Sequence, residues 1–272
     1  MDGIADYVFV RQLGEGNHGW FYLAERPPRL PVEDDLVVVK VLAGDASTEK
    51  FQRAVRELRA FAAVQSPYLV QLYDAGQDGG TVYYAMRYHP LGSLEEPAVD
   101  LTREGRLRAV NHAALAAHSL HEAGIVHRDI KPANILIDED GARLSDLGLA
   151  QYLHPGITVS ALGSLRSLEY VDPSVLRGNR VSRVSDVWSL GVTLHYALTG
   201  RGLYLDLPDA DPLLALRAVI KQVQSPPLLD ERLTEEEREV VMRAVAPDPA
   251  TRYPTAADFA EAVSDLTAVT RA

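Results

Sequence analysis

The residues best suited to chemistry lie in one short segment near the middle of the chain, residues 125–136. Within it, Asn134 follows Asp129 by five positions and comes just before an apolar run. A carboxylate in such a loop can accept a proton from a hydroxyl group, and an amide oxygen in the same loop can bind a hard cation. A chance turn held by a salt bridge accounts for this spacing much less well, so the segment predicts a catalytic loop.

A second carboxylate, Asp146, follows Asn134 by twelve positions in the triplet Asp146-Leu147-Gly148. Alone, such a triplet signals only a turn. Here it comes just after a predicted hairpin over residues 135–145, where it can supply a second oxygen ligand. We therefore predict a magnesium ion, with manganese as an alternative, that is held by these two side chains and bridges nucleotide phosphates.

A glycine-rich stretch near the N-terminus, residues 13–19, lies between two predicted strands. Its three glycines let backbone N–H groups approach phosphate oxygens closely. An ordinary glycine-rich hairpin explains the stretch at least as well when it is taken alone. A dinucleotide-binding turn explains it less well, because no helix follows.

Lys40 ends an apolar run over residues 37–39. A cation in a buried strand is costly unless a carboxylate or a phosphate lies beside it. Glu57, on the apolar-facing side of the next predicted helix, is a candidate partner. Taken singly, a solvated lysine at a strand end and a surface glutamate are the plainer interpretation.

The elements that must position these residues change in kind along the chain. The first third predicts short strands between turns rich in Gly, Pro and Asp, interrupted by one helix over residues 47–64. The Pro-rich, charged segment 26–35 is predicted to be an exposed loop. After about residue 88, helices dominate. The predicted strands cover residues 8–13, 20–24, 36–42, 69–73 and 82–88, and the predicted later helices cover residues 102–123, 183–199, 211–224, 235–246 and 255–266.

Composition limits the class of protein. The 272 residues are 47% hydrophobic, enough to bury a sizeable core in one large domain or in two packed lobes. Cysteine is absent, which excludes disulfides and thiolate metal sites and agrees with a reducing compartment. The net charge of -11 argues against nucleic acid as the main partner. Neither a membrane-spanning apolar run nor a secretory signal is visible, so we expect no membrane span and a cytoplasmic location.

Taken in order, these motifs resemble the catalytic domain of bacterial eukaryotic-like (Hanks-type) Ser/Thr protein kinases over almost the whole chain, from about Val8 to Leu266. The segment from His127 to Leu136 carries the resemblance most specifically. It implies an α+β class, two-lobed protein kinase fold. A small antiparallel β-sheet N-lobe with one main helix would cover residues 1–88, and a larger, mainly helical C-lobe would cover residues 89–272.

The resemblance also implies a role for each motif in transferring the γ-phosphate of ATP to protein hydroxyl groups. Asp129 would be the catalytic base, and Lys131 would neutralise the transferred phosphoryl group. Lys40, paired with Glu57, would bind the α- and β-phosphates. Asn134 and Asp146 would hold the magnesium ion. The implied nucleotide-binding residues are Leu13, Gly14, Gly16, Gly19, Phe21, Val38, Lys40, Met86, Arg87, His89 and Leu136.

The implied adenine pocket contains one departure from the family. Val38, Met86 and Leu136 would line it, with Met86 as gatekeeper and the backbone of residues 87–89 bonding the adenine edge. Phe21 stands where the family usually has valine over the adenine. The resemblance therefore implies a bulkier roof and an altered nucleotide affinity.

A second departure concerns Arg252, which the family pairs with a glutamate. Counting back without gaps from Asp186, which the resemblance places on a central buried helix bracing the catalytic loop, puts Ser174 at the glutamate position. An unpaired buried guanidinium is costly. Asp172 and Glu169 are therefore the alternative partners.

Arg128, beside the catalytic aspartate, implies control by phosphorylation of the loop over residues 151–168. We expect ATP and protein substrates as partners and leave open a homodimer that phosphorylates itself in trans. A location in the cytosolic part of a longer, membrane-anchored protein also stays open. The alternative function is a pseudokinase, a nucleotide-binding or protein-interaction scaffold, and a small-molecule phosphotransferase is disfavoured. The candidate phosphorylation sites are Thr158, Ser160, Ser164 and Ser167.

Overall fold

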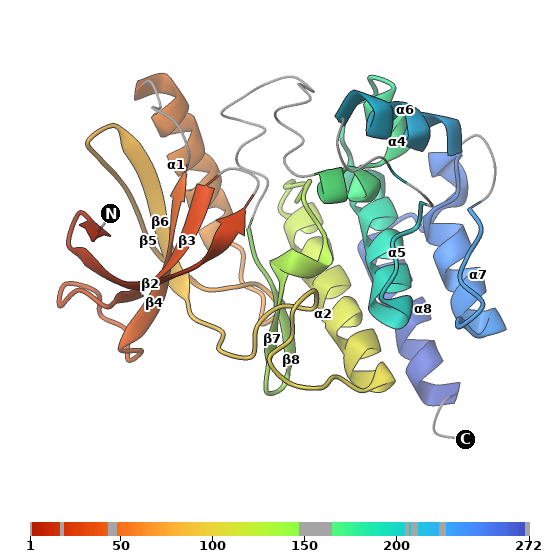
Figure 1. Ribbon diagram of the computed structural model, residues 1–272, viewed down its shortest axis with the longest axis horizontal. Helices are drawn as coiled ribbons and strands as arrows, with labels where there is room; N and C mark the ends of the chain where they lie inside the picture. The colour runs from red at the N-terminus through yellow and green to blue at the C-terminus, as the bar shows by residue number, and fades with distance from the viewer. Residues whose placement is uncertain are drawn as a thin grey trace. The chain divides into compact units, whose positions relative to one another are not determined.

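The computed structural model (Figure 1) describes residues 2–16, 19–42, 48–146, 165–204, 207, 212–222 and 227–269. These residues gather into two compact units. The first holds the described residues up to 65 together with 70–89, and the second holds 66–69, 90–146 and the described residues from 165 onward. A β-sheet dominates the first unit, and helices dominate the second.

The first unit is built on one six-stranded antiparallel sheet with the strand order β1-β2-β3-β4-β6-β5. Successive side chains of β4 (Leu36–Leu42) point to opposite faces, and the strand is buried on both. Helix α1 (Thr48–Ala62) belongs to the same unit and buries Leu58 and Phe61. The other strands are β1 (Gly3–Ile4), β2 (Tyr7–Gly16), β3 (Gly19–Glu25), β5 (Leu72–Asp78) and β6 (Thr81–Arg87).

The strand predicted over residues 69–73 is misplaced, because β5 begins only at Leu72. Leu69 and Val70 are buried, as their apolar character indicated. Leu69, however, belongs to the second unit and forms an isolated parallel bridge with Leu144 there. The N–H of Leu144 donates to the carbonyl oxygen of Tyr68 at 2.8 Å. A run of apolar residues predicts that the segment is buried. It does not predict which strand the segment pairs with.

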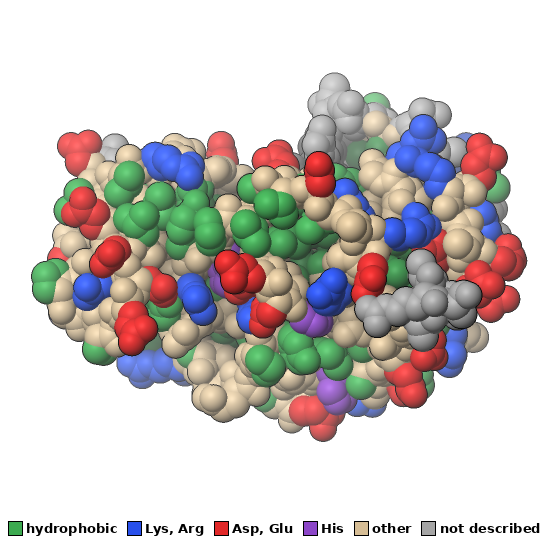
Figure 2. Space-filling view, turned by 90° about the horizontal axis from the view of Figure 1, so that it is seen from below, with side chains coloured by type: hydrophobic (Ala, Val, Ile, Leu, Met, Phe, Trp, Pro, Cys, Tyr) green, Lys and Arg blue, Asp and Glu red, His purple; other side chains and the backbone are tan. Residues whose placement is uncertain are grey.

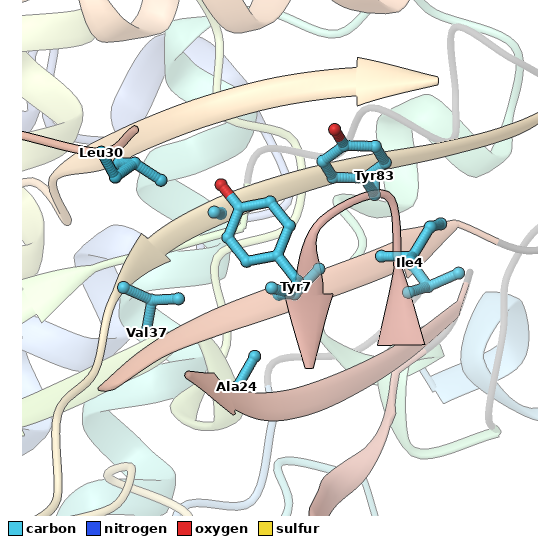
Figure 3. Close-up of a cluster of buried hydrophobic side chains, with 9 residues drawn as sticks. Ile4, Tyr7, Ala24, Leu30, Val37 and Tyr83 are labelled. Atoms are coloured by element: carbon cyan, nitrogen blue, oxygen red, sulfur yellow. The ribbon is translucent and has the colours of Figure 1, made fainter. Parts of the chain in front are cut away.

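The segment over residues 26–35, predicted as an exposed loop, is partly buried, so that prediction is wrong at its centre. Leu30 is 3% exposed and packs into a core on one face of the sheet (Figure 3). The N–H of Arg26 donates to the carbonyl of Asp35 at 3.0 Å, and its Nη1 donates to the carbonyl of Leu30 at 3.1 Å. These bonds fold the loop back on itself. The core comprises Ile4, Tyr7, Ala24, Leu30, Val37, Val39, Val41, Tyr83 and Ala85.

The second unit surrounds helix α5 (Arg183–Thr199), which is buried along almost its whole length. Ser182 and Ser185 form a capping box at its start, and Gly200 ends it in a left-handed conformation with φ of 67°. Several other helices of the unit pack against α5. An apolar helix that is covered in this way can carry a buried polar group only if that group is fully hydrogen-bonded.

Four of the other helices of the second unit begin and end close to the predicted positions, and a short helix over residues 173–176 was not predicted. Thr102, predicted as the first residue of a helix, is instead its N-cap and accepts from the N–H of Gly105 at 3.0 Å. The helices are α2 (Arg103–Glu122), α4 (Pro173–Leu176), α6 (Pro212–Gln222), α7 (Glu235–Ala244) and α8 (Ala256–Val269), with 3-10 turns η1 (Pro132–Asn134), η3 (Leu165–Tyr170) and η4 (Pro249–Thr251). A two-stranded hairpin, β7 (Ile135–Asp138) and β8 (Gly141–Leu144), completes the described part.

None of the helices within the described ranges combines the length and the apolar character that crossing a bilayer requires. On the face seen in Figure 2, acidic and basic side chains are interspersed, with apolar groups between them.

Candidate active site

The loop between α2 and β7 is anchored to α5 through the carboxylate of Asp186, which is 1% exposed. The N–H of His127 donates to Oδ2 of Asp186 at 2.8 Å, and the N–H of Arg128 donates to Oδ1 at 2.9 Å. Nε2 of His121 lies 2.7 Å from the same Oδ2. Asp186 therefore braces the loop, as the resemblance implied.

His127 is a fully buried residue of this loop. Burial lowers the pKa of its imidazole, against the opposing influence of Asp186. Its Nε2 lies 3.1 Å from the carbonyl oxygen of Ser145, and its Nδ1 accepts from the N–H of Asp129 at 3.4 Å. A neutral ring with its proton on Nε2 satisfies both contacts.

Arg128 has a φ of 74°, in the left-handed region that few residues other than glycine adopt. The hydrogen bond from its N–H to Asp186 helps to hold this strained backbone in place. Asp146, with a φ of 59°, is a second such residue. Both lie within the predicted site, where strained backbone is commonly found in enzymes.

Asp129, Lys131 and Asn134 come together in this loop. Nδ2 of Asn134 donates to the backbone carbonyl of Asp129 at 2.7 Å and to its Oδ2 at 3.0 Å. Nζ of Lys131 lies 3.1 Å from that same Oδ2. The predicted base, the predicted phosphoryl-neutralising lysine and one predicted metal ligand thus form a single hydrogen-bonded group.

The second predicted metal ligand, Asp146, follows directly after a residue tied to Asn134. Both the N–H and the hydroxyl group of Ser145 donate to the carbonyl of Asn134, at 2.8 Å and 3.0 Å. Because Nδ2 of Asn134 is occupied by Asp129, its Oδ1 is the atom left to face a cation. An amide oxygen and a carboxylate fit a hard divalent cation that also takes phosphate oxygens.

In the first unit, the glycine-rich stretch forms the end of the β2–β3 hairpin, with Gly14 opposite Phe21 and Gly16 opposite Gly19. Gly19 has a φ of 151°, and a Cβ added there would lie 2.0 Å from the carbonyl oxygen of Val41. A Cβ at Gly14 would meet nothing within 4 Å. Packing therefore explains why position 19 is glycine, but it does not explain the glycine at position 14. For Gly14, the close approach of a ligand to the backbone stays a prediction.

Lys40 lies in β4 and is 4% exposed. Its Nζ lies 4.8 Å from the centroid of the Phe21 ring and 6.0 Å from that of Tyr84. Glu57 is half-buried on α1, in the same unit. Its pairing with Lys40 stays a prediction.

Two of the residues predicted to contact adenine, Val38 and Met86, lie on the same face of the sheet as Lys40. Val38 pairs with Met86 across β4 and β6, and both are buried. The N–H of Arg87 donates to the carbonyl of Gln71 at 3.0 Å. Leu136 belongs to the second unit. The adenine pocket itself stays a prediction.

Arg252 has a carboxylate partner, and it is Asp172 rather than Glu169. Nη1 and Nη2 of Arg252 donate to the two oxygens of Asp172 at 2.7 Å and 3.2 Å, with both side chains almost completely buried. Asp172 is also the N-cap of α4 and accepts from the N–H of Ser174 at 2.8 Å. Glu169 instead accepts from the N–H of Leu203 at 3.1 Å. The ion pair thus sits two residues before the position found by ungapped counting.

Three of the four candidate phosphorylation sites, Thr158, Ser160 and Ser164, lie outside the described residues. Ser167 lies in the backbone turn η3.

Sequence reasoning missed His121, which contacts the bracing carboxylate of Asp186 directly. A histidine near the end of a polar-faced helix is usually a surface residue. Its place in the last turn of α2, six residues before His127, is the signal that could have marked it.

The protein-family model described as "Protein kinase domain" matches residues 7–263. The Ser/Thr-protein kinase PknJ of Mycobacterium tuberculosis is 34% identical over 274 residues, which cover 96% of this chain and 45% of that protein. The Ser/Thr-protein kinase PrkC of Bacillus subtilis is 30% identical over 259 residues, covering 93% and 39%. The chain thus spans less than half the length of these curated relatives.

Among solved structures, the kinase domain of Mycobacterium tuberculosis PknI is similar with a TM-score of 0.70 and 27% identity, over 97% of this chain and 98% of that one. The predicted fold class is confirmed by this likeness together with the sheet of the first unit and the helices of the second.

Proposed function

Because the chain belongs to the protein kinase domain family, whose model matches residues 7–263, we propose that it transfers the γ-phosphate of ATP to Ser and Thr hydroxyl groups of proteins. The observation that carries the proposal is the hydrogen-bonded group of Asp129, Lys131 and Asn134 on a loop braced by buried Asp186. Members of this family use ATP and a divalent cation. We take magnesium as the cation, with manganese as the alternative.

In the proposed reaction, the hydroxyl oxygen of the substrate bonds to the γ-phosphorus while the bond from that phosphorus to the β,γ-bridging oxygen breaks and ADP leaves. Asp129 accepts the proton of the hydroxyl group. Lys131, 3.1 Å from Asp129, neutralises charge on the phosphoryl group in transit. Asn134 and Asp146 would hold the divalent cation, and the cation would supply charge neutralisation at the phosphates. Positioning and charge neutralisation provide most of the acceleration, and proton acceptance adds a smaller share.

In the proposed nucleotide site, Lys40 binds the α- and β-phosphates and pairs with Glu57. The glycine turn covers the phosphates with backbone N–H groups. Val38, Met86 and Leu136 would contact the adenine. Leu13, Phe21 and the backbone from Arg87 to His89 complete the proposed set.

Further parts of the proposal concern the protein as a whole. We place the boundary between the lobes near residues 88 and 89, and the activity in the cytoplasm, where ATP is available. The partners are protein substrates and, for phosphorylation in trans, a second copy of the chain. The net charge of -11 disfavours nucleic acid.

The pseudokinase alternative drew support from Phe21 and from the altered activation segment, which includes the apparent loss of a partner for Arg252. That apparent loss no longer counts, because Arg252 pairs with Asp172. A chain that bound ATP without transferring phosphate would revive it.

The test is phosphate transfer from labelled ATP to the chain itself and to a generic unstructured protein, with small alcohols and sugars as competing acceptors. Asp129→Asn is expected to lower turnover by about 10²-fold or more, because the proton acceptor is lost. Asp140→Asn removes an exposed carboxylate from the nearby β7–β8 turn and should leave turnover unchanged. Equal turnover by wild type and Asp129→Asn would remove Asp129 from its role. Mass spectrometry of the incubated chain would identify which of Thr158, Ser160, Ser164 and Ser167 is modified.

A further inference from the structure

A row of side chains crosses the sheet of the first unit at Lys40. The strand register places Gly14, Phe21, Lys40 and Tyr84 opposite one another on β2, β3, β4 and β6. Residues directly opposite on neighbouring strands point to the same face. This is not the face of the core in Figure 3, because the valines of that core alternate with Lys40 along β4.

Two aromatic rings flank the ammonium group of Lys40 within this row. The Phe21 ring is the nearer, with its centroid 4.8 Å from Nζ, and the Tyr84 ring lies at 6.0 Å. The negative face of an aromatic ring attracts a cation, and the attraction grows as water is excluded. Lys40 is only 4% exposed, so the contact with Phe21 is made under favourable conditions. A valine at position 21 could not make it.

The ring of Phe21 also touches the glycine turn. A Cβ added at Gly16 would lie 2.8 Å from Cε2 of Phe21. The ring therefore fills the space between the backbone of the turn and the ammonium group. One side chain connects two parts of the proposed phosphate site, and a smaller residue would leave a gap between them.

We propose that Phe21 is a positioning residue for Lys40: its ring holds the ammonium group below the glycine turn, in place for nucleotide phosphates. This inference rests on the proposed function, in which Lys40 binds those phosphates. The resemblance implied a different role for position 21, a roof over the adenine. The two roles differ in which part of the nucleotide the Phe21 ring affects. A Lys40 positioner affects phosphate binding, whereas an adenine roof affects binding of the nucleoside.

The ring contact can be measured without nucleotide by ¹H–¹³C NMR of the lysine ε-methylene groups. Ring current from Phe21 should shift the Lys40 signal upfield, and the signal is assigned by its loss in Lys40→Met. Phe21→Leu, which keeps most of the bulk but no aromatic face, should abolish most of the shift. Phe21→Tyr should keep it. A Lys40 signal that is unchanged in Phe21→Leu would overturn the proposal.

The positioning role is then tested by calorimetric titration with ADP and with adenosine. Phe21→Leu should weaken ADP binding about fivefold to tenfold and change adenosine binding less than twofold. In a Lys40→Met background the same substitution should not weaken ADP binding further, because the group that it positions is gone. Equal weakening of ADP and adenosine would identify an adenine roof and overturn the proposal, as would a lost ring-current shift with unchanged ADP binding.

Tyr22→Leu is the matched control. Tyr22 is the next residue on β3, points to the opposite face and stacks on Phe9 with ring centroids 4.1 Å apart. Its loss removes an aromatic ring from the same strand but should leave both the Lys40 signal and the ADP affinity unchanged. A wild-type chain that bound neither ADP nor adenosine would overturn the proposed function and the phosphate role of Phe21 together, while the NMR shift would still report the ring contact separately.

Discussion

In the second unit, Asp129 and Asn134 are held by directional hydrogen bonds on a loop that is tied to the buried carboxylate of Asp186, whereas Lys40 in the first unit is held by strand register and aromatic rings. The loop includes Arg128, whose positive φ is a conformation that its surroundings must stabilise. The sheet places Lys40 through ordinary strand geometry. The described contacts of the loop are thus mainly directional hydrogen bonds, and those of Lys40 include two aromatic rings.

This difference predicts how each region fails. Removing one partner of a buried, hydrogen-bonded charge leaves the other unsatisfied and costs several kcal/mol. Removing one packing contact costs less, because its neighbours remain. Substitutions in the second unit should therefore have the larger effects.

The largest effect is expected for Asp172→Asn. The substitution keeps an oxygen to accept from the N–H of Ser174, but it leaves the guanidinium of Arg252 buried without a counter-charge. Breaking a buried ion pair of this kind costs about 3–5 kcal/mol, which urea unfolding would measure as a loss of unfolding free energy. The neighbouring Trp188, whose ring lies 4.9 Å from the guanidinium carbon, provides a fluorescence signal for the transition.

Glu169→Gln is the control for Asp172→Asn. Glu169 was the other carboxylate expected to pair with Arg252, but it accepts from the N–H of Leu203, and a glutamine can do the same. Its unfolding free energy should fall by less than about 1 kcal/mol. If the two substitutions cost the same, the Asp172 pair does not hold this region together.

The next largest effect is expected for Asp186→Asn. Its amide offers one acceptor where the carboxylate offered two, so one of the N–H groups of His127 and Arg128 must face an NH₂ group. We expect a loss of about 1–3 kcal/mol in unfolding free energy. Because the loop carrying Asp129 also shifts, kcat should fall about 10²-fold, while KM for ATP changes little.

Asp258→Asn is the matched control, since Asp258 accepts from the N–H of Thr255 at an exposed helix start. It should lower the unfolding free energy only slightly and leave kcat unchanged. An Asp186→Asn variant with full kcat would show that the loop does not depend on this brace.

The contacts among Asp129, Lys131 and Asn134 were predictable because these residues lie within a few positions of one another, and short spacing limits the possible geometries. The partner of Arg252 was not predictable, because Asp172 and Glu169 lie only three residues apart in the sequence. The structure shows that Asp172, which also caps α4, is the partner. His121 was missed for a related reason. Its contact with Asp186 spans 65 positions, and nothing in a helical pattern names the residue opposite.

The sheet shows the same limit. The apolar run over residues 36–42 predicted the strand but not that Phe21 and Tyr84 would stand on either side of Lys40, because register depends on the turns that join the strands. The buried loop residue Leu30 was hidden by charged neighbours. A single sequence predicts whether a segment is a helix or a strand better than it predicts contacts between residues that are far apart in the chain.

The smallest effect, and the one that tests the packing side of the comparison, is expected for Gly16→Ala. The new methyl group would lie within 2.8 Å of the Phe21 ring, so the ring must move from its place over Lys40. A forced ring displacement of this kind costs about 1 kcal/mol of unfolding free energy. Gly14→Ala is the matched control, because a Cβ there meets nothing within 4 Å, and it should be closer to neutral in stability.

A double-mutant cycle separates the ring clash from any other effect of the added methyl group. In a Phe21→Leu background the shorter side chain leaves room at position 16, so Gly16→Ala should cost less there than in the wild type. Urea unfolding of the four chains gives the coupling between the two positions. Equal costs in both backgrounds would mean that the Phe21 ring does not pack against the turn at Gly16.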